Sequence, residues 1–254
     1  MKALASIIAL LACLPVAAFD TVRFDAFDGI DITADVYLAN EDPQTPFIVL
    51  LHQAGYSRGE YREIAPKLVA LGYNCLAVDL RSGSGVRNVI NETAREATES
   101  GKAPTYLDAV TDILDAIYYA RDHYARGSVI LWGSSYSASL ALKMAADRPR
   151  LVQGVVAFSP GEYFYNLGKP SNWISESARK LEMPVFIASA RSEERLWHLI
   201  YQDMYSEDKV AFIPEHGGEH GSRALWEDSP GHEAYWQAVT AFLEKNFPTR
   251  PEKK

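Results

Sequence analysis

SVILWGSSYSASLALKMAA, residues 128–146, decides the fold of this chain. Its first five residues are apolar enough for a buried strand, and its last ten are typical of a helix. Between them, at a predicted strand-to-helix turn, Gly133 and Ser135 are separated by one residue, which is the spacing of the motif glycine, any residue, serine. Such a turn exposes the serine hydroxyl and points free amides of the helix N-terminus at a developing oxyanion. We therefore predict Ser135 as a nucleophile, although Ser137 stands where this motif usually has a second glycine.

Apolar runs similar to the one before Ser135 recur along the chain and are separated by helix-like segments. The runs are FIVLL (47–51), NCLAVDL (74–80), VQGVVAF (152–158), PVFIASA (184–190) and the weaker VAFIP (210–214). The helix-like segments are 61–72, 106–124, 137–149 and 229–247. Alternating strands and helices predict an α/β fold with a mostly parallel central sheet and helices on both of its faces.

The N-terminal part of the sheet is predicted to differ. Residues 21–39 alternate polar and apolar side chains around Asp28-Gly29, which is a strong hairpin signal. We expect an antiparallel hairpin before the parallel strands. The polar stretch 81–105 is long for a plain loop and is predicted to be a surface excursion after a strand, where binding loops are common.

A nucleophilic serine needs a general base, and in this kind of fold an acid and then a histidine follow the serine along the chain. Glu193 comes directly after the predicted strand 184–190, with Glu194 as the alternate acid. His220 lies in the glycine-rich loop after the last predicted strand, and His216 follows that strand too closely to reach as well. We predict a triad of Ser135, His220 and Glu193.

The oxyanion hole is predicted to use two backbone amides. One belongs to Tyr136, directly after the nucleophile, and the other to the loop after the first parallel strand. In that loop we predict the Ala54 amide, with Gln53 as the alternate, and we expect His52 to brace the loop by hydrogen bonding.

Five segments together resemble α/β-hydrolases, and particularly the dienelactone-hydrolase-like group: LLHQAGYSRGEY, AVDLRSGSG, WGSSYSASLAL, PVFIASARSEE and HGGEHGSRAL. The resemblance covers about residues 30–246 and implies an eight-stranded, mostly parallel sheet and a triad without a cofactor. The chain departs from the group in three ways. Ser135 replaces the cysteine of true dienelactone hydrolases, the acid is glutamate where aspartate is commoner, and Ser137 replaces a glycine.

Composition limits the remaining possibilities. The 254 residues are 48% hydrophobic and 23% charged, with a net charge of -8, which gives no basic footprint for nucleic acid. We predict one domain over residues 19–247, followed by a disordered tail at 248–254. No cysteine, histidine or carboxylate pattern predicts a metal site.

The first eighteen residues are predicted to be a secretory signal. Lys2 precedes the apolar run 3–14, and small residues end at Ala18, which is the order of a signal peptide with its cleavage site. The run is too short for a membrane span. Lipid attachment at Cys13 is the alternative. We expect an exported protein, periplasmic or secreted.

The leading functional hypothesis is a carboxylic-ester hydrolase that acts on a small-molecule ester through an acyl-enzyme on Ser135. A peptidase or amidase of the same fold is one alternative, and a non-catalytic binding protein on a hydrolase scaffold is another. The aromatic segment 161–173 is either a cap or acyl pocket above Ser135 or an ordinary connection. Sequence alone leaves the substrate and the oligomeric state open.

Overall fold

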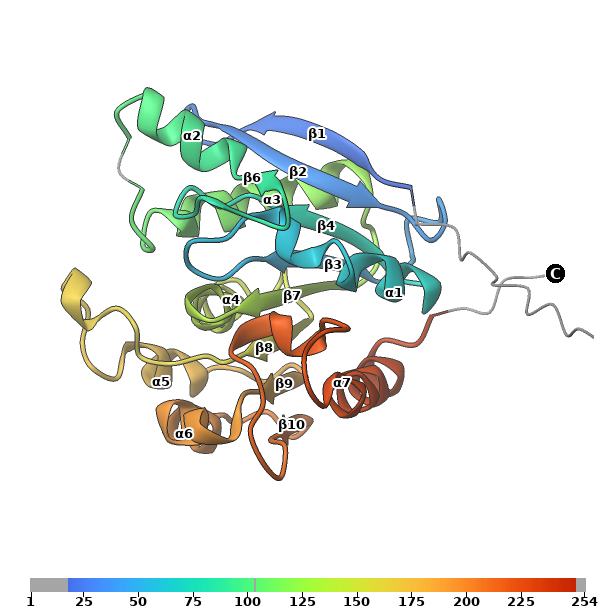
Figure 1. Ribbon diagram of the computed structural model, residues 1–254, viewed down its shortest axis with the longest axis vertical. Helices are drawn as coiled ribbons and strands as arrows, with labels where there is room; N and C mark the ends of the chain where they lie inside the picture. The colour runs from blue at the N-terminus through green and yellow to red at the C-terminus, as the bar shows by residue number, and fades with distance from the viewer. Residues whose placement is uncertain (1–17, 103, 250–254) are drawn as a thin grey trace, which may run out of the picture.

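An eight-stranded sheet forms the centre of the molecule (Figure 1), in the strand order β1-β2-β4-β3-β7-β8-β9-β10. The computed structural model describes residues 18–102 and 104–249. The strands are β1 (Asp20–Asp25), β2 (Asp31–Tyr37), β3 (Phe47–Leu51), β4 (Asn74–Val78), β7 (Val129–Ser134), β8 (Gly154–Phe158), β9 (Val185–Ala188) and β10 (Lys209–Phe212). From β4 to β10 all neighbouring strands are parallel, which confirms the predicted parallel sheet.

The first two strands form the predicted antiparallel hairpin, and β2 continues the antiparallel pairing onto β4. The turn spans residues 26–30 and closes with a 2.7 Å hydrogen bond from the Ala26 amide to the Ile30 carbonyl. Gly29 has a φ of 78°, a conformation that favours glycine because it has no Cβ.

Helices cover both faces of the sheet. α2 (Glu92–Glu99), α3 (Ala109–His123), α4 (Tyr136–Asp147), α5 (Trp173–Ala178) and α6 (Glu194–Asp203) pack on one face. α1 (Ile64–Ala70), α7 (His232–Asn246) and the short 3-10 helices η1 (Arg58–Tyr61) and η4 (Gly221–Leu225) pack on the other. Because strand side chains alternate between faces, neighbours on β7 enter different cores: Leu131 enters the core that includes α4, and Trp132 enters the opposite core, where its indole donates to Ser222 of η4.

The excursion after β4 contains a small hairpin, β5 (Gly85–Val86) and β6 (Val89–Ile90), and then α2. A further 3-10 turn, η2 (Tyr165–Leu167), follows β8, and η3 (Arg191–Glu193) follows β9. β4 and β9 are shorter than the predicted runs 74–80 and 184–190. Their last parallel ladder pairs are Val78 with Leu51 and Ala188 with Phe158, where both strands end. The Asp79 amide still donates a 2.9 Å hydrogen bond to the Thr33 carbonyl of β2.

Residues 1–17, which hold most of the predicted signal, and residues 250–254 of the predicted tail lie outside the described part of the chain. Thr249 still contacts the body of the protein, since its hydroxyl donates a 3.1 Å hydrogen bond to the Leu71 carbonyl. Over residues 18–102 and 104–249, none of the helices has the length and apolarity that a membrane span requires.

Candidate active site

Ser135 lies at the sharp turn between β7 and α4 with φ 60° and ψ -122°. This backbone conformation is strained for a residue with a Cβ, and such strain concentrates at functional sites. The turn is held by a 2.7 Å bond from the Ser135 amide to the Phe158 carbonyl. Gly133 is required beside it, because a Cβ there would lie 2.4 Å from the Ala138 Cα.

Ser137, at the position where the motif usually has glycine, strengthens the turn. Its hydroxyl accepts a 2.9 Å hydrogen bond from the Ser134 amide and donates a 2.8 Å bond to the Leu51 carbonyl at the end of β3. The hydroxyl therefore ties the turn to the neighbouring strand. The side chain is fully buried, so this departure from the motif is accommodated without an unpaired polar group.

His220 and Glu193 form a close pair, with 2.5 Å between the histidine Nδ1 and the carboxylate Oε1. The second oxygen of Glu193 accepts a 2.7 Å bond from the Ser159 hydroxyl. Burial raises the pKa of Glu193, but the hydrogen bonds from His220 and Ser159 outweigh it and the pKa lies below its usual value. An ionised Glu193 holds His220 with Nε2 free to act as a base.

The alternate acid Glu194 and the nearby His216 do not take part in this pair. The nearest charged partner of the Glu194 carboxylate is Arg191, at 3.8 Å, and not His220. The side chain of His216 is 90% exposed. The structure therefore pairs His220 with Glu193, the first of the two predicted acids.

The loop that carries His220 sits directly against the nucleophile turn. The Gly221 amide donates a 2.9 Å bond to the Ser159 hydroxyl, and the Ser222 amide donates a 2.8 Å bond to the Ser134 hydroxyl. Gly221 has a φ of 71°, and a Cβ on it would lie 2.4 Å from the Ser134 Oγ. Ser135, Glu193 and His220 come from segments that follow β7, β9 and β10, so they meet at the carboxyl edge of the sheet.

Of the three amides considered for the oxyanion hole, two are available. Tyr136 is the first residue of α4, and the first amides of a helix have no partner within it. The Ala54 amide has no acceptor among residues 18–102 and 104–249. The Gln53 amide, in contrast, donates a 2.8 Å bond to the Glu60 carboxylate, which removes it from the set.

His52 braces the oxyanion loop, as the sequence predicts. Its Nδ1 donates to the Gln53 carbonyl at 2.8 Å, and its Nε2 accepts from the Leu80 amide at 2.9 Å and from Asn91 at 3.1 Å. Complete burial lowers the pKa of His52 to about 4. The neutral ring therefore connects the loop after β3 to the segment after β4.

Glu60 is a functional candidate that the sequence analysis missed. It is fully buried in η1, and burial raises its pKa to about 7 against the opposing effect of hydrogen bonds from Ser134 and Gln53. Ser159, with a φ of 53°, was missed as well. A polar residue directly after β8, at the carboxyl edge of the sheet, is a signal that could have identified Ser159.

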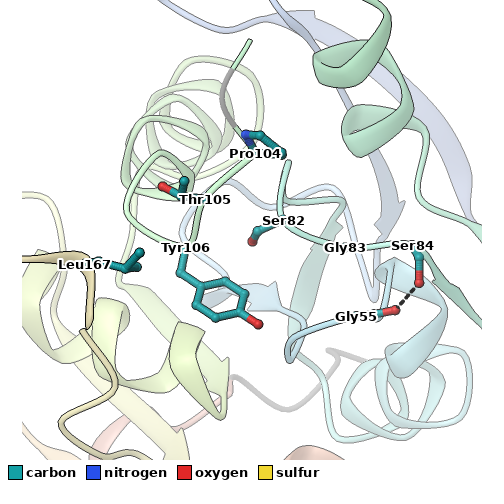
Figure 2. Close-up of a pocket in the computed structure, with 8 residues that line it drawn as sticks. All are labelled: Gly55, Ser82, Gly83, Ser84, Pro104, Thr105, Tyr106 and Leu167. Atoms are coloured by element: carbon teal, nitrogen blue, oxygen red, sulfur yellow. Dashed lines mark hydrogen bonds between the residues drawn. The ribbon is translucent and has the colours of Figure 1, made fainter. Parts of the chain in front are cut away.

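A pocket of about 440 Å³ has Gly55, the residue after Ala54, and Tyr106 in its lining. Figure 2 shows Leu167 and Ser84 on opposite sides of the Tyr106 ring. Tyr106 stacks on Tyr136 with ring centroids 4.4 Å apart, and the Tyr136 hydroxyl lies 2.5 Å from the Ser82 Oγ. The pocket is lined by Gly55, Ser82, Gly83, Ser84, Pro104, Thr105, Tyr106 and Leu167. Leu167 belongs to the aromatic segment 161–173, so part of that segment forms a wall of the pocket.

Within the described residues, no group of three or more histidine, cysteine, aspartate or glutamate side chains could hold a metal ion. The chemistry available at this edge of the sheet is that of a serine hydroxyl, an imidazole–carboxylate pair and free amides.

The parallel sheet, the strained serine turn and the histidine–carboxylate pair define an α/β-hydrolase fold. The sequence profile of the S33 serine aminopeptidase family matches residues 42–211, and the chain belongs to this family. No curated protein matches the chain.

Solved structures of hydrolases share the fold at low sequence identity. An esterase of Pyrococcus furiosus, Pf2001, is 17% identical with a TM-score of 0.69, over 91% of this chain and 93% of its own. A dienelactone hydrolase of Anabaena variabilis is 16% identical with a TM-score of 0.68, over 91% and 98%. Est1E of Butyrivibrio proteoclasticus, solved with ferulic acid bound, is 14% identical with a TM-score of 0.67, over 89% and 98%.

Proposed function

We propose that this protein is a serine hydrolase that cleaves carboxylic esters through an acyl-enzyme on Ser135. The observation that carries the proposal is the strained backbone of Ser135 at the β7–α4 turn, against which the loop of the His220–Glu193 pair is hydrogen-bonded. A backbone in this conformation costs about 1–3 kcal/mol and persists only where the surroundings enforce it.

In the proposed reaction His220 takes the proton of the Ser135 hydroxyl as the oxygen attacks the ester carbonyl. The amides of Ala54 and Tyr136 hold the oxyanion, and each such donor lowers the activation barrier by about 3–4 kcal/mol. His220 then returns its proton to the departing alcohol. A water molecule, deprotonated by the same imidazole, attacks the acyl-enzyme; the acid leaves and the imidazolium returns the proton to the Ser135 oxygen.

The pocket favours an uncharged aromatic or hydroxylated group on the substrate. Its described lining offers the Tyr106 ring, the Leu167 side chain and several hydroxyls, and none of the lining side chains is charged. A charged group buried there would lose its hydration without gaining a partner. Esters of neutral aromatic acids should therefore be hydrolysed with lower KM than esters of charged acids.

Turnover of p-nitrophenyl butyrate and labelling by a fluorophosphonate probe test the assignment. Ser135→Ala should lower kcat by about 10⁴–10⁶-fold and abolish labelling. Ser177→Ala, a matched control in α5 whose hydroxyl donates to the Trp173 carbonyl of its own helix, should leave both unchanged. Turnover or labelling that survives Ser135→Ala would refute the nucleophile.

The family description favours a second function, removal of an N-terminal amino acid from a peptide. An aminopeptidase must bind a free ammonium group, which calls for a carboxylate near the nucleophile. The pocket lined by Tyr106 and Leu167 has no carboxylate in its lining. Glu193 pairs with His220, and Glu60 accepts hydrogen bonds from Ser134 and Gln53. Hydrolysis of alanine p-nitroanilide with no hydrolysis of esters would support the aminopeptidase instead.

We also propose that the chain is exported and begins at Phe19 after processing. The proposal rests on the order of residues 1–18 and on the packing of Phe19, whose ring lies 5.1 Å from that of Tyr37 and 4.0 Å from the Arg62 guanidinium. The intact mass of the protein from its native host tests this. A lipid-modified chain beginning at Cys13, or an unprocessed chain, would contradict it.

A further inference from the structure

Glu60 lies behind the nucleophile turn with no solvent exposure. Its Oε1 accepts a 2.7 Å hydrogen bond from the Ser134 hydroxyl, and its Oε2 accepts a 2.8 Å bond from the Gln53 amide. Both neighbours donate, which is the arrangement that suits an ionised carboxylate. The Glu60 carbonyl is fixed as well, by a 2.9 Å bond from the Trp226 indole.

This one carboxylate connects the three loops that form the site. Ser134 directly precedes the nucleophile, and Gln53 directly precedes the oxyanion amide of Ala54. The Ser134 hydroxyl that donates to Glu60 also accepts a hydrogen bond from the amide of Ser222, two residues after His220. Removing a charge from the centre of such a buried network affects every loop that it holds.

We propose that ionised Glu60 is a positioning residue for this site: it holds the loops of Ser135, Ala54 and His220 in register and stabilises the imidazolium that forms on His220 during turnover. The inference rests on the proposed serine hydrolase function. It predicts that the enzyme is fully active only when both Glu60 and His220 are deprotonated.

The electrostatic surroundings of Glu60 support a change of charge near neutral pH. The titratable groups that interact with it are His220 from the loop after β10, Tyr136 from α4 and Tyr61 from η1 itself. Burial raises the pKa of Glu60 to about 7, and the bonds from Ser134 and Gln53 and the charge of His220 act in the opposite direction.

The dependence of kcat on pH for p-nitrophenyl butyrate, followed at the isosbestic wavelength of nitrophenol, tests the proposal. In the wild type the acid limb falls with the uptake of two protons. Glu60→Gln keeps the shape of the side chain and removes its charge. It should lower kcat at pH 8 by about 10–100-fold, by analogy with other supporting groups, with KM little changed. Its acid limb should follow one proton and move to lower pH, because the protonation of Glu60 no longer contributes to it.

Ser134→Ala gives the opposite displacement. It removes one of the two hydrogen bonds that favour ionised Glu60, so the carboxylate takes up its proton at higher pH and the acid limb moves up. Glu63→Gln is the matched control, because Glu63 pairs with Arg87 at the surface, and its profile should match the wild type. A purely structural role for Glu60 would lower the amount of folded enzyme without moving the limb in either variant.

The direction in which the acid limb moves in the two variants distinguishes the possible outcomes. Opposite displacements in the two variants support the proposal, and unchanged or parallel limbs overturn it. If Glu60→Gln does not fold, as judged by circular dichroism, the Ser134→Ala limb decides alone. The Ser135→Ala enzyme, measured alongside, shows whether the proposed function itself holds. Loss of turnover there, together with unmoved limbs, would reject the role of Glu60 and leave the serine mechanism standing.

Discussion

Replacing Glu60 by glutamine should change the free energy of unfolding by an amount that depends on pH and is more favourable to the variant at alkaline than at acid pH. Burial raises the pKa of Glu60 from its ordinary value of 4.5 to about 7, so the folded state binds this proton more tightly than the unfolded chain does. The resulting stability is fully present below about pH 4.5 and is lost as the pH rises through about 7. At about 1.4 kcal/mol for each pKa unit, the loss reaches about 3 kcal/mol.

Glutamine has no proton to lose, so the difference in free energy of unfolding between variant and wild type should grow by about 2.5 kcal/mol from pH 5 to pH 8. Urea denaturation at the two pH values, followed by the fluorescence of the five tryptophans, measures this difference. Other carboxylates titrate equally in both proteins and cancel. Glu63→Gln, which removes a surface ion pair with Arg87, should change stability by less than about 1 kcal/mol at either pH. A difference for Glu60→Gln that is the same at both pH values would refute the reasoning.

Three further outcomes follow from the site. Glu193→Gln should lower kcat by about 10⁴-fold, because the amide no longer stabilises the charged form of the paired histidine. Glu194→Gln should have little effect on kcat. If steady-state kinetics show the larger loss for Glu194→Gln, Glu194 is the acid of the triad. Tyr106→Ala should raise KM for aromatic esters by about tenfold, the equivalent of about 1.4 kcal/mol of binding, with kcat unchanged, since the ring lines the pocket; an unchanged KM would place the substrate elsewhere. Gly133→Ala should destabilise the fold in urea by about 1–3 kcal/mol or more, because its Cβ would overlap the backbone of Ala138; a variant of normal stability would contradict the tight turn.

The order of strands and helices was predictable because each element carries its own local signal. Continuous apolar runs marked the buried parallel strands, and the alternating pattern around Asp28-Gly29 marked the hairpin. The errors lie at strand ends, such as the residues after Val78 and Ala188. The predicted runs continue to Leu80 and Ala190, but the parallel ladder ends with the pairs of Val78 with Leu51 and Ala188 with Phe158.

Glu60 shows where sequence reasoning stops. In the sequence it is one of two acidic residues in the polar stretch 57–63, and most such residues are exposed. Only the folded chain places its carboxylate between the Ser134 hydroxyl and the Gln53 amide, out of contact with water. Its raised pKa arises from that burial, and no local pattern encodes it.

The sequence by itself determined the class of fold, the serine turn and the order of the predicted acid and histidine, because these depend on residues adjacent in the chain. The tertiary structure decided which carboxylate faces His220, that the Gln53 amide is bonded whereas among the described residues the Ala54 amide is free, and what lines the pocket. These choices depend on segments far apart in the chain, such as Glu193 and His220, which only the packing of strands β7 to β10 brings together.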